Sequence, residues 1–240
     1  MADVRVFEDL DALSHAAAEQ FVEAAAEAIA QTRRFVVALA GGSTPRTMYE
    51  SLAAAELAAQ VDWGLVHVAW GDERCVAPDD ARSNSRMARE AFLDRVPISE
   101  AHVHRIKGEL GPEAGAADYE RVLHELFVAG RPRFDLVLLG LGKDGHTASL
   151  FPRDPTLRER TRWVAGVEMP DVEPRVPRVT LTLPVINAAG RVWFLVAGSG
   201  KCRVLRAVLD EPGAGASRSP AAMVQPAGEL VWFVDRTAYR

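Results

Sequence analysis

The chain has 240 residues, of which 48% are apolar and 25% charged, and a formal net charge of -5 at neutral pH. This length suffices for one sizeable α/β core, and we expect residues 1–240 to form a single domain. The absence of a Lys/Arg run argues against nucleic acid or an anionic membrane as a partner. Without a signal peptide or an apolar segment of roughly 20 residues, the expected location is cytoplasmic.

Apolar runs and helical periodicity alternate along the chain. The predicted strands cover residues 4–7, 35–40, 65–70, 103–106, 134–139, 163–167, 179–183, 192–197 and 230–234. The predicted helices cover residues 9–31, 45–57, 84–93, 114–128 and 201–209. Residues 153–177 are otherwise expected to be loops around one edge, and residues 213–220 a loop. This alternation predicts an α/β fold with a mostly parallel sheet flanked by helices.

The most informative segment follows the predicted strand 134–139. It contains three glycines within residues 140–145, together with Asp144 and His146. Loops at the carboxyl ends of parallel strands are where ligands bind, and a carboxylate two residues before an imidazole suits an oriented general base. The plainer alternative is a turn between strand and helix that carries a surface histidine.

A second glycine turn, Gly-Gly-Ser-Thr-Pro at residues 41–45, leads into a predicted helix. Ser43 or Thr44 can cap this helix, and Pro45 suits its first turn. The free N–H groups there favour an anion such as phosphate. The segment matches neither the P-loop nor the dinucleotide-binding pattern. An ordinary capped turn is the alternative.

Charged side chains follow two further strands. Asp72, Glu73 and Arg74 come after the strand 65–70, and Lys201 begins a helix after the strand 192–197. A solvated ion-pair cluster and a surface lysine are the plainer interpretations. Combined with the two glycine turns, these groups suit a small phosphorylated substrate.

Four segments together resemble the 6-phosphogluconolactonase family. They are Ala-Gly-Gly-Ser-Thr-Pro at 40–45, Trp-Gly-Asp-Glu-Arg at 70–74, Gly-Lys-Asp-Gly-His-Thr-Ala-Ser-Leu-Phe-Pro at 142–152 and Arg-Val-Thr-Leu-Thr-Leu-Pro-Val-Ile-Asn at 178–187. The resemblance implies a Rossmann-like fold of the sugar-phosphate isomerase type. It also implies hydrolysis of 6-phosphogluconolactone to 6-phosphogluconate in the oxidative pentose phosphate pathway, with no required metal or organic cofactor.

The same resemblance implies a role for each matching residue. His146 would be the general base that activates water against the lactone carbonyl, and Asp144 would orient its ring. The substrate- and phosphate-binding residues would be Gly42, Ser43, Thr44, Arg74, Lys201, Arg178 and Asp72, the last without an assigned role. No Gly-x-Ser-x-Gly elbow is present, which favours attack by water over an acyl-enzyme. The expected partner is a small phosphorylated sugar lactone, and the expected state is a monomer or a small homo-oligomer.

Two other functions share some of these features. Glucosamine-6-phosphate deaminases and related isomerases resemble the chain in the same turns. In the deaminase, however, a Tyr stands where this chain has Arg74, and a Glu where it has Phe151. The other alternative is a non-catalytic sugar-phosphate sensor, against which the intact pair of Asp144 and His146 counts.

Two groups of residues invite a metal or disulfide interpretation, and neither is favoured. Cys75 and Cys202 are far apart and lack the spacing of a zinc site or a disulfide framework. His102 and His104 would share one face of the predicted strand 103–106, but no further ligand accompanies them. We therefore expect no metal site.

Overall fold

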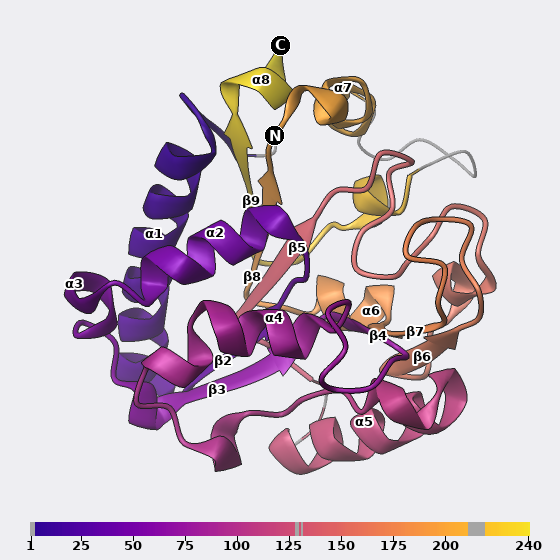
Figure 1. The fold of residues 1–240 in the computed structure, drawn as a ribbon, viewed down its shortest axis with the longest axis horizontal. Helices are drawn as coiled ribbons and strands as arrows, with labels where there is room; N and C mark the ends of the chain where they lie inside the picture. The colour runs from indigo at the N-terminus through magenta and orange to yellow at the C-terminus, as the bar shows by residue number, and fades with distance from the viewer. Residues whose placement is uncertain (1–2, 128–129, 131, 211–218) are drawn as a thin grey trace.

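A six-stranded parallel sheet forms the centre of the computed structural model, which describes residues 3–127, 130, 132–210 and 219–240 (Figure 1). The order across the sheet is β1-β9-β8-β5-β2-β3, and each pair of neighbouring strands is parallel. The strands are β1 (Asp3–Phe7), β2 (Phe35–Leu39), β3 (Val66–Trp70), β5 (Leu136–Gly140), β8 (Arg191–Val196) and β9 (Glu229–Asp235). The predicted strands in these six places are confirmed.

Helices surround this sheet. They are α1 (Leu10–Thr32), α2 (Ser43–Leu52), α3 (Ala55–Ala58), α4 (Asn84–Ala91), α5 (Pro112–Leu126), α6 (Leu183–Asn187), α7 (Cys202–Asp210) and α8 (Arg236–Tyr239). In Figure 1, α1 and α2 lie side by side, and α7 and α8 lie together near both chain ends. One predicted helix, 45–57, is in fact two, because α2 ends at Leu52 and α3 starts at Ala55.

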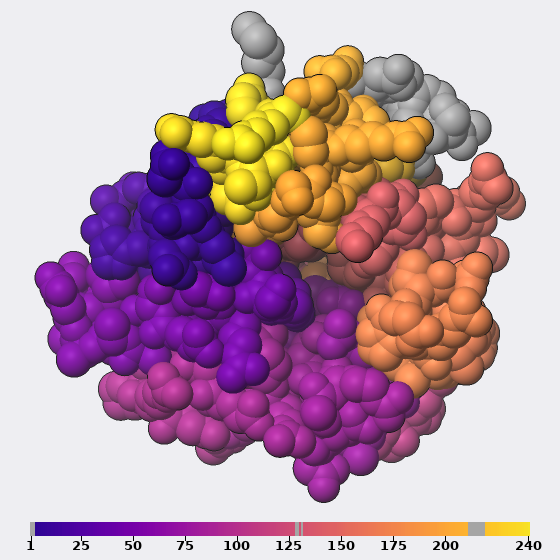
Figure 2. Space-filling model, turned by 45° about the horizontal axis from the view of Figure 1, so that its top comes forward, coloured from indigo at the N-terminus to yellow at the C-terminus, as the bar shows by residue number. Residues whose placement is uncertain are grey.

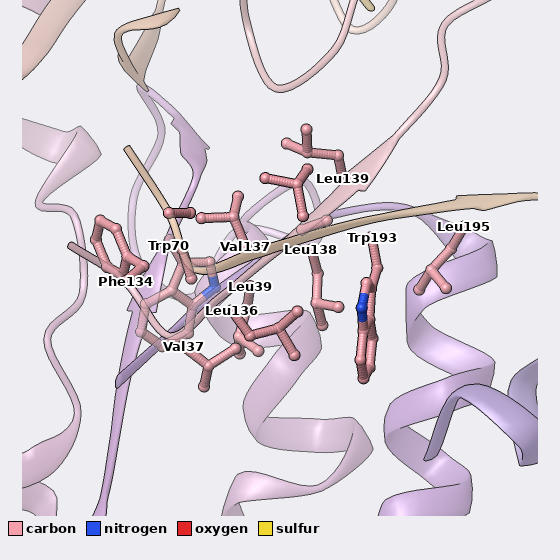
Figure 3. Packing of buried hydrophobic residues seen from close by; sticks show 14 of the residues in the cluster. Val37, Leu39, Trp70, Phe134, Leu136, Val137, Leu138, Leu139, Trp193 and Leu195 are labelled. Carbon is pink, nitrogen blue, oxygen red and sulfur yellow. The ribbon is translucent and has the colours of Figure 1, made fainter. Parts of the chain in front are cut away.

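The apolar runs of the sequence become the central strands of the sheet. All five residues of β2 and the first four of β5 are buried. A parallel strand covered on both faces needs apolar side chains at every position, not only at alternate ones. Leu138 and Leu139 point to opposite faces of β5, and both are enclosed by neighbouring apolar side chains (Figure 3).

A smaller antiparallel sheet, which the sequence did not predict, lies beside the main one. Its order is β4-β7-β6, with β4 (Asp72–Arg74), β6 (Val164–Val167) and β7 (Arg178–Leu181). The predicted strands 163–167 and 179–183 therefore exist, but they belong to this second sheet. Helix α5 packs against β6 and β7. Since β4 begins two residues after β3 ends, the small sheet adjoins the carboxyl edge of the large one.

The order of the strands reverses direction at one point in the parallel sheet. The chain runs from β2 to β3 at one edge, then returns to β5 on the other side of β2 and continues to β8 and β9. In open α/β sheets, ligands bind at the carboxyl ends of the two strands that flank such a reversal. The fold alone therefore directs attention to the ends of β2 and β5.

The predicted strand 103–106 is absent, and His102 and His104 do not share the face of a strand. Residues 103–106 form only an isolated bridge between Val103 and Val68 of β3. That bridge brings a third histidine, His67 of β3, against the other two. Its Nδ1 lies 3.1 Å from Nε2 of His104, and its ring centroid lies 4.1 Å from that of His102.

We expect this histidine cluster to lower stability in mild acid. Burial, and then the positive charges of His102, His104 and Arg34, lower the pKa of His67 to about 4. An unfolded histidine titrates near 6.5, so between about pH 6.5 and 4 the unfolded chain binds more protons than the folded one. The free energy of unfolding should therefore fall as the pH falls through this window. Urea midpoints measured across it should fall less in His67→Gln, and an unchanged pH dependence would contradict this explanation.

Two further expectations concern segments outside the core. Of the predicted loop 213–220, residues 213–218 lie outside the described residues. Within the described ranges, none of the helices combines the length and apolar character that crossing a membrane requires.

Candidate active site

A cavity of about 580 Å³ opens at the reversal point of the sheet, beside the ends of β2, β3 and β5. In Figure 2 the surface is hollowed near its centre, where purple, salmon and orange parts of the chain meet. Seven of the nine predicted site residues line it, namely Gly42, Asp72, Arg74, Asp144, His146, Arg178 and Lys201. The other two, Ser43 and Thr44, do not line it.

The loop after β5 holds His146 and Asp144 in direct contact. Nδ1 of His146 lies 2.5 Å from Oδ1 of Asp144, and the same oxygen accepts the His146 backbone N–H at 3.2 Å. The Gly142 N–H donates to the His146 carbonyl at 2.8 Å and closes the loop. With Asp144 ionised, Nδ1 carries the proton as donor, and Nε2 is left as the proton acceptor.

Gly142 is required by this arrangement. A Cβ added there would lie 2.1 Å from Nδ1 of His146, so any side chain would displace the imidazole. The ring also has an apolar neighbour, Phe151, with ring centroids 4.8 Å apart. The imidazole is therefore in contact with both a glycine backbone and an aromatic ring.

The Asp144 carboxylate is ionised at neutral pH. Its partial burial raises the pKa, but the hydrogen bond and charge of His146 outweigh that effect, and the pKa lies below its ordinary value. A carboxylate that stays charged can stabilise a positive charge that forms on the ring it orients during a reaction. The pair can therefore take up a proton at Nε2 and stabilise the resulting charge.

Two cationic side chains from different parts of the chain, Lys201 and Arg74, line the cavity. Nζ of Lys201, which ends the short 3-10 helix Ser199–Lys201 after β8, donates to the Leu141 carbonyl at 2.6 Å. Burial, and then the nearby charge of Lys143, lower its pKa below the usual range for lysine. Arg74, at the end of β4, donates from Nη1 to the Arg82 carbonyl at 2.7 Å. Both side chains are thus held at the cavity wall by backbone carbonyls.

Arg178 lines the cavity, but its contacts differ from those expected of a phosphate ligand. It is only 4% exposed, and it donates from Nε to the Val176 carbonyl at 3.1 Å and from Nη2 to the Pro174 carbonyl at 2.8 Å. Burial lowers the pKa of its guanidinium. Two of its nitrogens therefore hold the segment before β7, and a role in phosphate binding stays a prediction.

The two acidic residues after β3, Asp72 and Glu73, have different surroundings. The Glu73 carboxylate is buried and accepts four hydrogen bonds from the start of α4 and its surroundings. The donors are the backbone N–H groups of Arg74, Asn84 and Ser85 and the hydroxyl of Ser83. Glu73 is therefore committed to the structure, whereas Asp72 faces the cavity.

The start of α2 is formed differently from the expectation. The N-cap is Gly42, with φ of 105°, and it makes no side-chain capping bond. Capping by Ser43 or Thr44 is therefore wrong, because both already lie inside the helix. The positive φ explains the glycine, and the first N–H groups of α2 remain free to face the cavity edge where Gly42 lies.

Several lining residues were not predicted as site residues, among them Asn84, Lys143, Val172 and Glu173. Asn84 occupies the space beside Gly41, where a Cβ would come within 1.9 Å of its Oδ1, and its Nδ2 donates to the Asp72 carbonyl at 2.9 Å. Lys143 lies inside the motif 142–152 and could have been chosen from its charge. Residues 172 and 173 follow no periodic pattern that could have indicated them.

No group of three or more His, Cys, Asp or Glu side chains in the described ranges is arranged to hold a metal ion. The cluster of His67, His102 and His104 is likewise not arranged as a metal site.

The model of one protein family matches residues 8–232, and its description is "Glucosamine-6-phosphate isomerases/6-phosphogluconolactonase". The chain belongs to this family. A Synechocystis protein named 6-phosphogluconolactonase is 45% identical over 216 residues, which cover 88% of this chain and 86% of that protein. The likeness thus extends over nearly the whole length of both proteins.

Solved structures of the same family agree with the fold described above. The 6-phosphogluconolactonase from Thermotoga maritima is 31% identical, with a TM-score of 0.83 over 98% of this chain and all of that one. The enzyme from Leishmania guyanensis is 32% identical, with a TM-score of 0.85 over 99% of this chain and 97% of that one. The predicted Rossmann-like fold of the isomerase and lactonase type is confirmed.

Proposed function

We propose that the chain hydrolyses 6-phospho-D-glucono-1,5-lactone to 6-phospho-D-gluconate, the reaction of the oxidative pentose phosphate pathway that gives its relatives their name. The observation that carries the proposal is the pairing of His146 with Asp144 in the same cavity as Arg74 and Lys201. An acid–base pair near two cations suits a substrate with a carbonyl at one end and a phosphate at the other.

The reaction needs one proton transfer in each direction. Nε2 of His146 takes a proton from water as its oxygen adds to the lactone carbonyl. The bond between that carbon and the ring oxygen then breaks, and the imidazolium returns the proton to the ring oxygen. A positioned base contributes typically 10²- to 10⁴-fold, which suffices because a δ-lactone is already an activated ester.

The cations supply orientation rather than acid–base chemistry. Arg74, Lys201 and the free N–H groups at the start of α2, with the hydroxyls of Ser43 and Thr44 nearby, would hold the phosphate. Anchoring this remote group aligns the carbonyl with the water and the base. Arg178 would contribute to substrate binding indirectly, because it holds the backbone segment before β7.

Two residues support hydrolysis over the ring-opening chemistry of the deaminases. Phe151 lies against His146 at the place where the deaminase has a carboxylate, so the imidazole lacks that partner. The Glu73 carboxylate is already engaged as the acceptor of N–H groups at the start of α4. A single chain of residues 1–240 acting as one domain, as a monomer or small homo-oligomer in the cytoplasm, completes the proposal.

The test is hydrolysis of freshly prepared lactone in a pH-stat, with the spontaneous rate subtracted because this lactone also opens unaided. Acceleration that saturates with substrate supports the proposal. Binding of the phosphorylated product without acceleration would instead indicate a sensor, and release of ammonia from glucosamine 6-phosphate would indicate a deaminase.

Removing the charge of Asp144 should move the acid limb of the pH profile. A base works only when it is neutral, and a negative charge beside a base stabilises its protonated form. In Asp144→Asn, the fall of kcat/KM toward acid should therefore begin at a lower pH than in the wild type. Rates at pH 5 to 8 check this. The phosphate ionises near pH 6 as well, and a limb that stays in place would assign it to the substrate and Asp144 to the loop structure.

A further inference from the structure

We infer that Asp72 acts as a positioning residue, which fixes the loop that carries His146 to β4, the strand that carries Arg74. This inference rests on the proposed function and concerns a residue for which the sequence motif indicated no role. The bond that carries it is the 2.6 Å contact from the Ser149 hydroxyl to Oδ2 of Asp72. Ser149 is fully buried, and Asp72 is 7% exposed.

The segment that follows His146 is attached at both of its ends. The Thr147 hydroxyl donates to the Gly140 carbonyl at the end of β5, at 2.8 Å. The Ser149 backbone N–H donates to the Thr180 hydroxyl of β7 at 3.2 Å. Together with the bond to Asp72, these contacts make the loop a bridge from the parallel sheet to the small antiparallel sheet.

The backbone of this bridge is under constraint. Ala148, between the two attached residues, has φ of 48°, a left-handed conformation that is unusual for a residue with a side chain. Such conformations persist where the surroundings determine them. The hydroxyl bonds of Thr147 and Ser149 on either side are the contacts that do so, and Ala148 itself lines the cavity.

Asp72 lies on the same strand as Arg74, one of the two cations that line the cavity. Strand β4 contains both Asp72 and Arg74, with one residue between them. Bonds from Asn84 to the Asp72 carbonyl, at 2.9 Å, and to its Oδ1, at 3.3 Å, hold this strand in place. The Ser149–Asp72 bond therefore sets the separation between His146 and Arg74, which must match the span from lactone carbonyl to phosphate.

A direct role for Asp72 at the phosphate fits its surroundings less well. A carboxylate repels a phosphate, and both of its oxygens already accept protein hydrogen bonds. The charge of Asp72 favours the protonated form of the nearby Arg178 guanidinium. Asp72 is thus better suited to holding its neighbours than to holding the substrate.

The test compares Ser149→Ala with the wild type on the phosphorylated lactone. A small displacement of the base can cost about 100-fold, so kcat should fall about 10- to 100-fold, while the Kd for 6-phosphogluconate changes less than about threefold. Thr182→Val is the matched control, because it removes another buried hydroxyl bond, from Thr182 to the Arg162 carbonyl beside β7. It should leave kcat within about twofold. Wild-type kcat in Ser149→Ala would overturn the inference.

A double-mutant cycle separates positioning from direct contact. When two residues act as one unit, the effects of their substitutions are not additive. The kcat of the double variant Asp72→Asn/Ser149→Ala should therefore lie within about threefold of the kcat of the more impaired single variant. Losses that multiply would overturn the inference and place Asp72 at the substrate. Should Ser149→Ala fail to fold, Asp72→Asn alone must show the fall in kcat with retained product binding.

One measurement does not depend on activity. The NMR signals of the His146 imidazole can be assigned by their loss in His146→Ala. They should shift or broaden in Ser149→Ala and not in Thr182→Val. Unchanged signals would overturn the inference even if the wild type hydrolysed no lactone. An inactive wild type with the shifted signals would instead reject the proposed function and leave the positioning role supported.

Discussion

His146→Ala should lower kcat by about 10²- to 10⁴-fold, the largest effect expected of any single change in this chain. The substitution removes the group that takes the proton from water, and leaves the cations that bind the phosphate. The Kd for 6-phosphogluconate should therefore change by only a few-fold. Steady-state rates of lactone hydrolysis, with calorimetric titration of the product, measure both quantities.

His15→Ala is the matched control for this experiment. His15 is exposed on α1, where it pairs with Glu19, and it lies outside the cavity lining. Its replacement should leave kcat and product binding unchanged. Near-normal kcat in His146→Ala would reject the general base, and the water would then have to be activated by another group of the cavity.

Replacing either cation should produce the second largest effect. Arg74→Ala or Lys201→Ala removes a charge-assisted hydrogen bond worth about 1.5 to 3 kcal/mol. That corresponds to a loss of roughly 10- to 150-fold in kcat/KM for the phosphorylated lactone. Hydrolysis of the unphosphorylated lactone should barely change, because it lacks the group that these side chains contact.

The comparison of the two lactones is what assigns the role. Equal losses on both substrates would mean that Arg74 or Lys201 serves the chemical step or the folded structure. Arg121→Ala offers a control of the same charge, since Arg121 is exposed on α5 and pairs with Glu125. It should retain the full preference for the phosphorylated substrate.

The sequence predicted the parallel sheet well, because its strands are buried on both faces. An uninterrupted apolar run such as 134–139 has few other interpretations in a chain with this alternation of strands and helices. The small sheet was missed for the opposite reason. β4 is three charged residues, Asp72, Glu73 and Arg74, which only its pairing with β7 makes a strand.

The site was predictable where its residues share a short segment. Asp144 and His146 lie two residues apart, and local hydrogen bonds alone bring them together. The bond between Asp72 and Ser149 was not predictable, because the two residues are distant in sequence and meet only when the loop after β5 packs against β4. The sequence motif placed Arg178 at the site, yet only the structure shows that its guanidinium holds backbone carbonyls.

The reversal of strand order has a consequence for how the activity arises during folding. The cavity is lined by chain segments between residue 39 and residue 201, which meet only after β2, β3, β5 and β8 have joined one sheet. Pairings between segments so distant form slowly, because closing long loops is entropically unfavourable. Catalytic competence therefore depends on pairings across most of the chain, and a fragment that lacks any of these four strands also lacks part of the site.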